Sequence, residues 1–261
     1  MLRSRIIPCL LVHDEGLNKT ECFNKGKYVG DPLNAVKIFN EKQVDEIVIL
    51  DIDKTVESKD PDFKLIESLA NESRMPLCYG GGIKTVNQAL KIISLGVEKI
   101  ALSSALLDNL NLSNEIAKFI GKQSVVLALD VKKKLFGNDY NVYTHNGKNK
   151  FSKTLIEILK ELKKYQIGEV LLNSIDRDGK MNGYDYNLVD LAKKYLDVPL
   201  TVIGGASDYN DLKELIKRYK IIGAAAGSLF VFNGKFKAVL INYPNRNERL
   251  KIYNETNYSR S

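Results

Sequence analysis

Two glycine turns are the clearest chemical signal in the sequence. Gly81 and Gly82 follow one short apolar run, and Gly204 and Gly205 follow another. Glycine lets the backbone approach a ligand closely with its N–H groups free, an arrangement that binds anions. The next apolar run in each case ends in small residues that can begin a short helix, whose N-terminus also attracts anions. Those small residues are Ser103, Ser104, Gly227 and Ser228.

A single turn of this kind is commonly just a tight turn after a strand. Two related turns instead predict two phosphate-binding sites, and therefore a long ligand with two phosphates.

Aspartates end several other apolar runs, where a carboxylate can transfer protons or stabilise a developing cation. They are Asp51, Asp53, Asp130, Asp176 and Asp178. Helix capping or pairing with lysines is the structural alternative. Asp130 follows the apolar run 125–129 and has few structural uses, so it is the favoured catalytic residue; Asp51 and Asp178 fit either interpretation.

Charged residues also stand at the starts of four apolar runs. If those runs converge, two acids and two bases would neutralise one another in a ring. Spacing alone favours a stabilising ion-pair cluster, the usual role of that end of a barrel. The four residues are Arg5, Glu46, Lys99 and Glu169.

The sequence offers no constellation for nucleophilic or metal chemistry. Its two histidines, His13 and His145, fall in expected loops, and the three cysteines have no metal-like spacing. We therefore expect no metal and no cofactor. An odd number of cysteines without a disulfide pattern also suggests a reducing cytoplasm.

Eight short apolar runs must position these residues, and helical patterns follow most of them. Their alternation predicts an α/β fold, a single (β/α)₈ TIM barrel. An open doubly wound sheet is the alternative. The predicted strands are residues 5–12, 46–52, 76–80, 98–103, 124–131, 168–174, 199–203 and 221–226, and the clearest predicted helices are 31–43, 85–95 and 208–219.

An internal half-barrel repeat favours the barrel. Residues 75–107 resemble residues 198–230, and matching positions such as Pro76 and Pro199 lie 123 residues apart. Two duplicated halves of four strands each explain this register, whereas an open sheet does not.

Two long connections, 13–30 and 132–147, leave the first and fifth predicted strands and should lie at the C-terminal face, where barrel active sites form. We expect the barrel to span residues 1–243. Residues 244–261 are predicted to be a polar, loosely held C-terminal tail.

Composition excludes several classes of protein. The 261 residues are 44% hydrophobic and 27% charged, typical of a soluble domain, and no run is long enough for a membrane span. The net charge of +7 comes from scattered lysines, so we expect attraction of small anions but no nucleic-acid partner.

Five motifs, taken in order, resemble one family, the cyclase subunit of imidazole glycerol phosphate synthase. The resemblance runs from residue 1 to about residue 243. The motifs are RIIPCL at 5–10, GDP at 30–32, DEIVILDI at 45–52, YGGGI at 79–83 and SIDRDGKMNGYD at 174–185.

The resemblance implies a cytoplasmic barrel that receives ammonia from a glutaminase docked on its N-terminal face. The ammonia reacts with a bisphosphorylated ribulosyl imidazolecarboxamide to form imidazole glycerol phosphate in histidine biosynthesis. It implies that the glycine turns hold the phosphates, that Asp130 is the acid or base, and that the four-charge ring is an ammonia gate. Further substrate-binding candidates are Lys19, Asp51, Asp178 and Gly179.

Two positions depart from the family pattern. Leu11 stands where the family has a second catalytic aspartate, and Ser103 replaces an asparagine near one phosphate. Leucine can neither accept nor donate a proton, and loss of one acid or base typically lowers the rate by ~10²–10⁴.

This pattern leaves several functions open. The chain resembles both the histidine-pathway cyclase and a side branch that handles ammonia for acetamidino-sugar formation beside a sugar amidotransferase. A non-catalytic scaffold or ammonia conduit, and the sister isomerase of the same pathway, are further alternatives; the charged ring and Leu11 speak against the isomerase.

Overall fold

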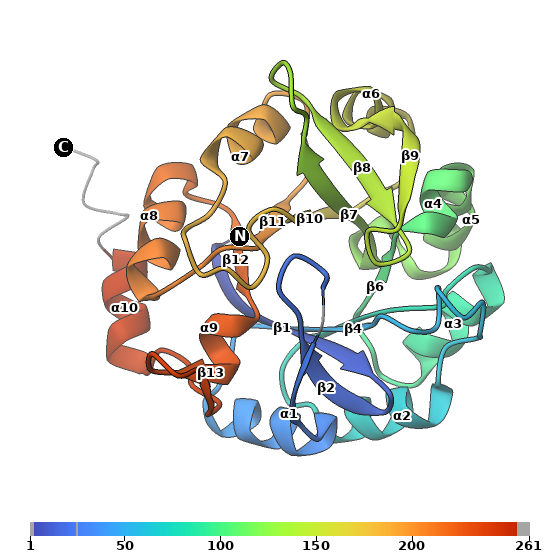
Figure 1. Ribbon diagram of the computed structural model, residues 1–261. Helices are drawn as coiled ribbons and strands as arrows, with labels where there is room; N and C mark the ends of the chain where they lie inside the picture. The colour runs from blue at the N-terminus through green and yellow to red at the C-terminus, as the bar shows by residue number, and fades with distance from the viewer. Residues whose placement is uncertain (1–2, 25, 255–261) are drawn as a thin grey trace.

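Eight parallel strands close into a barrel in the computed structural model, which describes residues 3–24 and 26–254 (Figure 1). The strands are β1 Arg5–His13, β4 Ile47–Asp51, β5 Leu77–Gly80, β6 Lys99–Leu102, β7 Val125–Lys133, β10 Glu169–Ser174, β11 Leu200–Ile203 and β12 Gly223–Ala226. Each pairs in parallel with two neighbours, and the β10–β7 and β12–β1 pairs close the ring. The predicted barrel is confirmed, and the open-sheet alternative is wrong.

The outer layer consists of helices that surround this ring (Figure 1). Asp31, Thr85 and Asp208 cap α1, α3 and α8 by accepting backbone N–H bonds, as their positions predict. The helices of this layer are α1 Pro32–Glu41, α2 Phe63–Glu72, α3 Val86–Ser94, α5 Asn111–Ile120, α6 Leu155–Glu161, α7 Tyr186–Lys193 and α8 Tyr209–Tyr219; two short 3₁₀ turns, Lys122–Ser124 and Leu162–Lys164, lie beside α5 and α6.

Strand residues divide into two apolar cores because successive side chains point to opposite faces. On β1, Ile6 packs outward against the helices, whereas Ile7 and Cys9 point into the barrel. The interior cluster consists of Ile7, Cys9, Val48, Cys78, Ala101, Val126, Leu171, Ile203 and Ala225. Because both faces of these strands are buried, their sequences are nearly continuous apolar runs.

The half-barrel repeat is visible in the elements themselves. β5 and β11 occupy Leu77–Gly80 and Leu200–Ile203, again 123 residues apart. A short helix follows the next strand in each half: α4 Ser104–Asp108 after β6, and α9 Ser228–Val231 after β12. The two anion-binding candidates are therefore built by the same sequence of elements.

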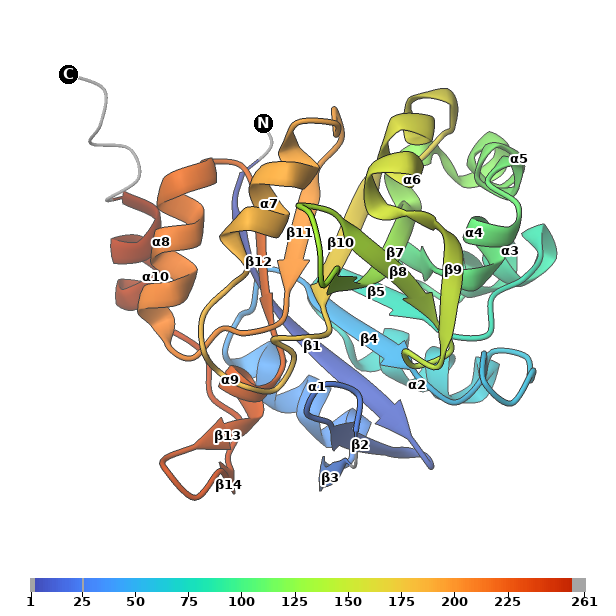
Figure 2. The ribbon, with the colours of Figure 1, turned by 45° about the horizontal axis from the view of Figure 1, so that its top comes forward.

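The two long connections form hairpins, not irregular loops. The first contains β2 Gly16–Lys19 and β3 Lys27–Gly30, so Lys19 lies on a strand. The second contains β8 Tyr140–Thr144, which pairs with the extended end of β7 and with β9 Asn149–Thr154. Figure 2 places β2, β3 and α9 at the end of the barrel toward which the β1 and β11 arrows point.

The segment after residue 243 differs from the expected loose tail. α10 Arg246–Asn254 packs against α8, and its Ile252 is buried. Tyr243 is also buried, and its hydroxyl donates to the carbonyl of Ile6 at 2.9 Å. The polar composition of this segment gave no sign of the packing, because Ile252 is the one residue of α10 that is both apolar and buried. Residues 255–261 lie outside the described part of the chain.

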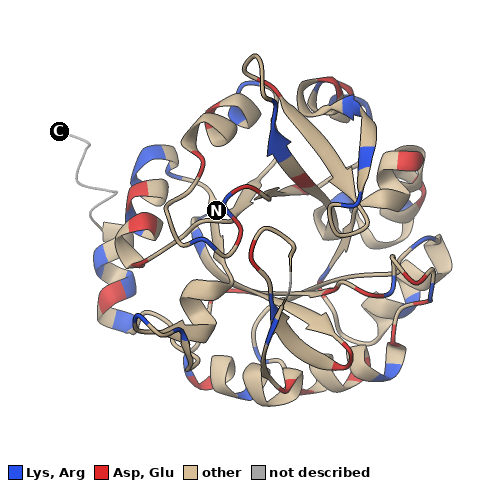
Figure 3. Cartoon of the chain, in the orientation of Figure 1, with Lys and Arg blue, Asp and Glu red and all other residues tan. Residues whose placement is uncertain are grey.

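Surface charge of both signs is spread over the outer helices (Figure 3). No helix in the described residues is both long and apolar enough to cross a bilayer. A short hairpin, β13 Phe232–Asn233 with β14 Ala238–Val239, completes the fold.

Candidate active site at the barrel mouth

A central cavity of about 110 Å³ opens where the barrel strands end. One side is polar, with Asp130 from β7 and Asn173 from β10. The opposite side is apolar and includes Leu11 from β1 and Leu50 from β4. The remaining lining residues are Cys9, Lys19, Thr20, Phe23, Ile52, Ala128, Leu129, Asn146, Leu171, Asp178 and Ile203.

The first glycine turn forms a cradle beside this cavity. Gly81 has φ +129°, and a Cβ there would lie 2.4 Å from the Asp51 carbonyl oxygen, so the turn requires glycine. Ser103 Oγ is buried without a hydrogen-bond partner among the described residues, which leaves it available to a ligand. The cradle is lined by Gly81, Gly82, Ser103 and Ser104, as expected.

The second glycine turn forms a matching cradle. Gly205 has φ +108°, and a Cβ there would lie 2.1 Å from the Gly183 carbonyl oxygen. This cradle is lined by Gly204, Gly205, Gly227 and Ser228, together with Lys19, Asp178 and Gly179.

The central cavity adjoins both cradles and shares lining residues with each. It shares Asp130 with the first cradle and shares Lys19 and Asp178 with the second. The structure therefore brings the predicted phosphate-binding turns to opposite sides of one mouth, with a carboxylate between them. A ligand with two terminal phosphates fits this arrangement.

Asp130 is the best candidate for proton transfer. Burial raises the pKa of its carboxyl to about 6, although a 2.9 Å hydrogen bond from Asn173 Nδ2 favours the ionised form. A carboxyl with a pKa near 6 exchanges protons readily near neutral pH, as a general acid or base requires.

Lys19 and Asp178 form a buried ion pair with Nζ and Oδ1 2.7 Å apart. The Lys19 side chain also lies against the second cradle, since a Cβ on Gly227 would be 3.0 Å from Lys19 Cε. Asp178 thus holds the ammonium group where it can meet an anion.

The other aspartates have different roles. Asp51 is buried and lines the first cradle, while its Oδ1 accepts from the backbone N–H groups of Asp53 and Lys54. Burial raises the pKa of Asp51 despite these bonds. Asp176 is exposed and accepts from the Lys133 N–H at 2.8 Å, so it supports the β7 extension outside the cavity.

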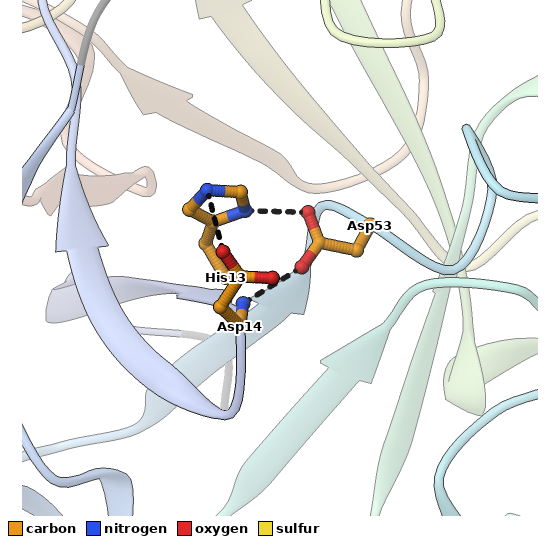
Figure 4. Close-up of side chains that lie close together, drawn as sticks. All are labelled: His13, Asp14 and Asp53. Atoms are coloured by element: carbon orange, nitrogen blue, oxygen red, sulfur yellow. Dashed lines mark hydrogen bonds and ion pairs between the residues drawn. The ribbon is translucent and has the colours of Figure 1, made fainter.

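Asp53 also lies outside the cavity, in a cluster with His13 and Asp14 (Figure 4). His13 Nδ1 is 2.7 Å from Asp53 Oδ1, and this hydrogen bond raises the pKa of His13. The three side chains could offer atoms to a cation, although no metal is expected from the sequence. The contacts tie the end of β1 to the segment after β4. His13 ends β1 and does not lie in a loop.

The four charges at the opposite end form one closed ring. Lys99 Nζ lies 2.8 Å from both Glu46 Oε1 and Glu169 Oε2, and Arg5 Nη2 lies 2.7 Å from Glu169 Oε1. Arg5 also pairs with Glu46. Burial alone would raise the pKa of Glu169, but Arg5 and Lys99 outweigh it and lower that pKa to about 2. This geometry suits both a stabilising cluster and an inlet.

Several site residues are absent from the sequence interpretation. Asn173 faces Asp130 only because β10 pairs with β7, 43 residues away in sequence. Thr201 joins the charged ring by donating to Glu169. Asn146 donates to the Ile52 carbonyl at 2.8 Å and so places its hairpin over the cavity. Strand pairing places Asn173 and Thr201, and a hydrogen bond from a turn places Asn146; no sequence motif signals any of the three.

Comparison with known proteins gives a consistent assignment. A family model described as "Histidine biosynthesis protein" matches residues 5–237. The chain is 55% identical over 96% of both chains to a provisionally named imidazole glycerol phosphate synthase subunit hisF3 of Vibrio vulnificus. A provisionally named HisF subunit of Leptospira interrogans is 51% identical over 97% of this chain and 100% of its own. An imidazole glycerol phosphate synthase subunit HisF of Lactococcus lactis is 35% identical over 88% and 89%. With its closed barrel and its paired cradles, this chain belongs to the histidine biosynthesis protein family.

Proposed function

We propose that the chain is the cyclase subunit of an imidazole glycerol phosphate synthase. It would combine ammonia with a bisphosphorylated ribulosyl imidazolecarboxamide to give imidazole glycerol phosphate and an aminoimidazole carboxamide ribotide. The observation that carries this proposal is the central cavity, lined by Asp130, that lies between two glycine cradles and shares lining residues with both.

The residues suggest a division of labour. The cradle of Gly81, Gly82, Ser103 and Ser104 would bind one phosphate, and the cradle of Gly204, Gly205, Gly227 and Ser228 the other. Lys19, steadied by Asp178, would neutralise charge at the second phosphate. Asp51 and Gly179 would support the substrate at the two cradles, and Asp130 would move protons at the reacting carbons between them.

Ammonia would enter from the opposite end. A glutaminase subunit docked on the N-terminal face would deliver it to the ring of Arg5, Glu46, Lys99 and Glu169, which would act as a gate. The relatives are named as subunits, which supports an assembly of this kind. The barrel interior beyond the ring is lined mainly by apolar side chains, and a small neutral molecule can pass such a surface without strong binding.

The test uses the purified chain with ammonium chloride and the ribulosyl substrate, and follows imidazole glycerol phosphate. We expect product formation with ammonium alone. Absence of product at saturating ammonium and substrate would overturn the proposal.

Leu11 makes a sharper test possible. It lines the apolar side of the cavity at the position of the family's second aspartate, so we expect slow turnover. Leu11→Asp should raise kcat by about 10-fold or more, because a second proton-transfer group typically contributes ~10²–10⁴. Leu11→Asn, which matches aspartate in shape but does not ionise, is the control and should give no gain. Equal rates for both variants would show that Leu11 does not limit the reaction.

Leu11 is also the basis of a second candidate, which the names of the relatives do not favour: a paralogue that passes ammonia to a sugar amidotransferase for an acetamidino group. This candidate predicts ammonia transfer from the glutaminase without ring closure. Imidazole glycerol phosphate formation at an ordinary rate would exclude it.

A further inference from the structure

Asn173 is the nearest hydrogen-bonding neighbour of Asp130. The two residues are register partners in the parallel β10–β7 pair, and Asn173 Nδ2 donates to Asp130 Oδ1 at 2.9 Å. An ionised carboxylate only accepts hydrogen bonds, so the NH₂ end of the amide must face it. The carbonyl end must therefore point elsewhere.

That carbonyl oxygen is unusual. Asn173 Oδ1 is buried and has no hydrogen-bond partner among the described residues, although its side chain lines the central cavity. Gly204 makes room for it, because a Cβ at that position would lie 2.9 Å from Oδ1. A buried acceptor without a donor is unfavourable, and one on a side chain that lines a cavity can be satisfied by the N–H or O–H of a ligand.

The position of Asn173 indicates which ligand this is. Leu171 and Ala128 lie two residues earlier on the same strands and belong to the interior of the barrel. Asn173 and Asp130 thus form the next layer above the apolar interior. A small molecule that leaves the interior reaches the Asn173 amide at the boundary with the cavity.

We propose that Asn173 receives the ammonia: its Oδ1 accepts a hydrogen bond from the incoming nitrogen, while its Nδ2 holds the Asp130 carboxylate in position. The inference rests on the proposed function and adds a residue that connects the nitrogen source to the proton-transfer group. Ammonia is a hydrogen-bond donor, and the interior cluster below this layer offers it no oxygen acceptor from a side chain. Asn173 is a ligand-binding residue toward ammonia and a positioning residue toward Asp130.

Two substitutions separate these roles. Asn173→Leu has a similar shape but neither donates nor accepts, whereas Asn173→Asp keeps an oxygen and loses the donor. Ser174→Ala is the matched control: it removes a buried hydroxyl, also without a partner, from the next position of β10, outside the cavity. Circular dichroism and urea unfolding verify that all three variants fold.

The first measurement is the KM for ammonia, with ammonium chloride as the nitrogen source and the bisphosphate saturating. Asn173→Leu should raise it about 10-fold, Asn173→Asp less, and Ser174→Ala not at all. An unchanged KM for ammonia, or a rise confined to the KM for the bisphosphate, would overturn the receiving role. The second outcome would assign Oδ1 to a donor on the sugar instead.

The second measurement is the titration of Asp130, followed by the pH dependence of kcat/KM and by carbon-13 NMR of labelled aspartate. Asn173 opposes the effect of burial on this carboxyl, whose pKa is about 6. Asn173→Leu should therefore move the acid limb upward by about one pH unit, and Asn173→Asp further, since a second carboxylate repels the first. An unmoved titration would overturn the positioning role.

The results also distinguish this inference from the proposed function. If the wild-type chain is active and both Asn173 variants behave like Ser174→Ala, the inference is wrong but the proposed function stands. An inactive wild-type chain defeats the proposed function, and the receiving role falls with it.

Discussion

At the scale of single residues, Asp130 combines a functional gain with a cost in stability. Its burial raises the pKa of the carboxyl to about 6, from an ordinary value near 3.8. Burial therefore favours the neutral form, so the carboxyl stays protonated in the folded state up to about pH 6. In the unfolded chain the same group ionises near pH 4, so the penalty develops between pH 4 and pH 6.

Asp130→Asn should abolish most activity and stabilise the protein. We expect kcat to fall by about 10²–10⁴. At pH 7 the free energy of unfolding should rise by about 1–3 kcal/mol, the upper value being two pKa units at ~1.4 kcal/mol each. The gain should disappear by pH 4, where the wild-type carboxyl is protonated in both states. Urea unfolding at pH 4 and pH 7 measures this; equal gains at both would contradict the explanation.

At the scale of elements, each cradle depends on a turn that only glycine allows. The turn after β11 brings Gly205 against the Gly183 carbonyl oxygen, at a distance that leaves no space for a Cβ. A glycine turn of this kind can offer its backbone N–H groups to an anion, and Gly204 and Gly205 both line the second cradle. Anion affinity is thus a property of the whole strand–turn–helix unit, not of one side chain.

Gly205→Ala should therefore damage the second cradle. We expect phosphate affinity to fall about 10-fold or more and the free energy of unfolding to fall by about 1–3 kcal/mol, the usual cost of a strained backbone. Gly234→Ala is the control, because Gly234 also has a positive φ, +69°, but nothing lies within 4 Å of its Cβ position. Calorimetry with inorganic phosphate compares the two; equal affinities would show that the turn does not hold the anion.

α10 shows that one buried side chain can anchor a polar element. Ile252 is 4% exposed, whereas its neighbour Leu250 is 46% exposed. Ile252→Ala should lower the free energy of unfolding by about 2–3 kcal/mol, as for other buried aliphatic truncations. Leu250→Ala should change it by less than about 0.5 kcal/mol. Chemical denaturation of both variants is the measurement, and similar losses would mean that α10 is not packed through Ile252.

At the scale of the whole molecule, the charged ring joins distant strands. Arg5, Glu46, Lys99 and Glu169 come from or adjoin β1, β4, β6 and β10, so their contacts span the barrel. The same closure brings two halves of the repeat together and sets their glycine cradles on one mouth. The charged ring and the cavity therefore lie at opposite ends of one barrel.

Glu169→Gln tests the energetic part of this picture. Because Arg5 and Lys99 lower the pKa of Glu169 to about 2, its stabilising contribution is present above pH 4.5 and is lost as pH falls toward 2. The variant should be less stable by about 3 kcal/mol at pH 7. Below pH 3 the difference should shrink, as measured by urea unfolding across this range. A constant difference would indicate that packing, not charge, holds the ring.

Much of this molecule could be predicted from residue patterns. The eight apolar runs match the barrel strands within a few residues, and Asp31, Thr85 and Asp208 cap helices as expected. The glycine turns and Asp130 also lie at the mouth as predicted. These features are local: a cap, a turn or a strand end is encoded within a few residues, and strand direction then assigns it to one end of the barrel.

The rest required strand closure. Asn173 meets Asp130, Thr201 meets Glu169, and Lys19 meets Asp178 across 159 residues of chain. The packing of α10 and the division of the aspartates into cavity and surface groups depend on the same long-range geometry. The sequence by itself determined the barrel, its repeat and its two anion-binding turns, because these follow from periodicity and backbone chemistry. Only the tertiary structure decided which side chains share a cavity, because that depends on which strands become neighbours when the ring closes.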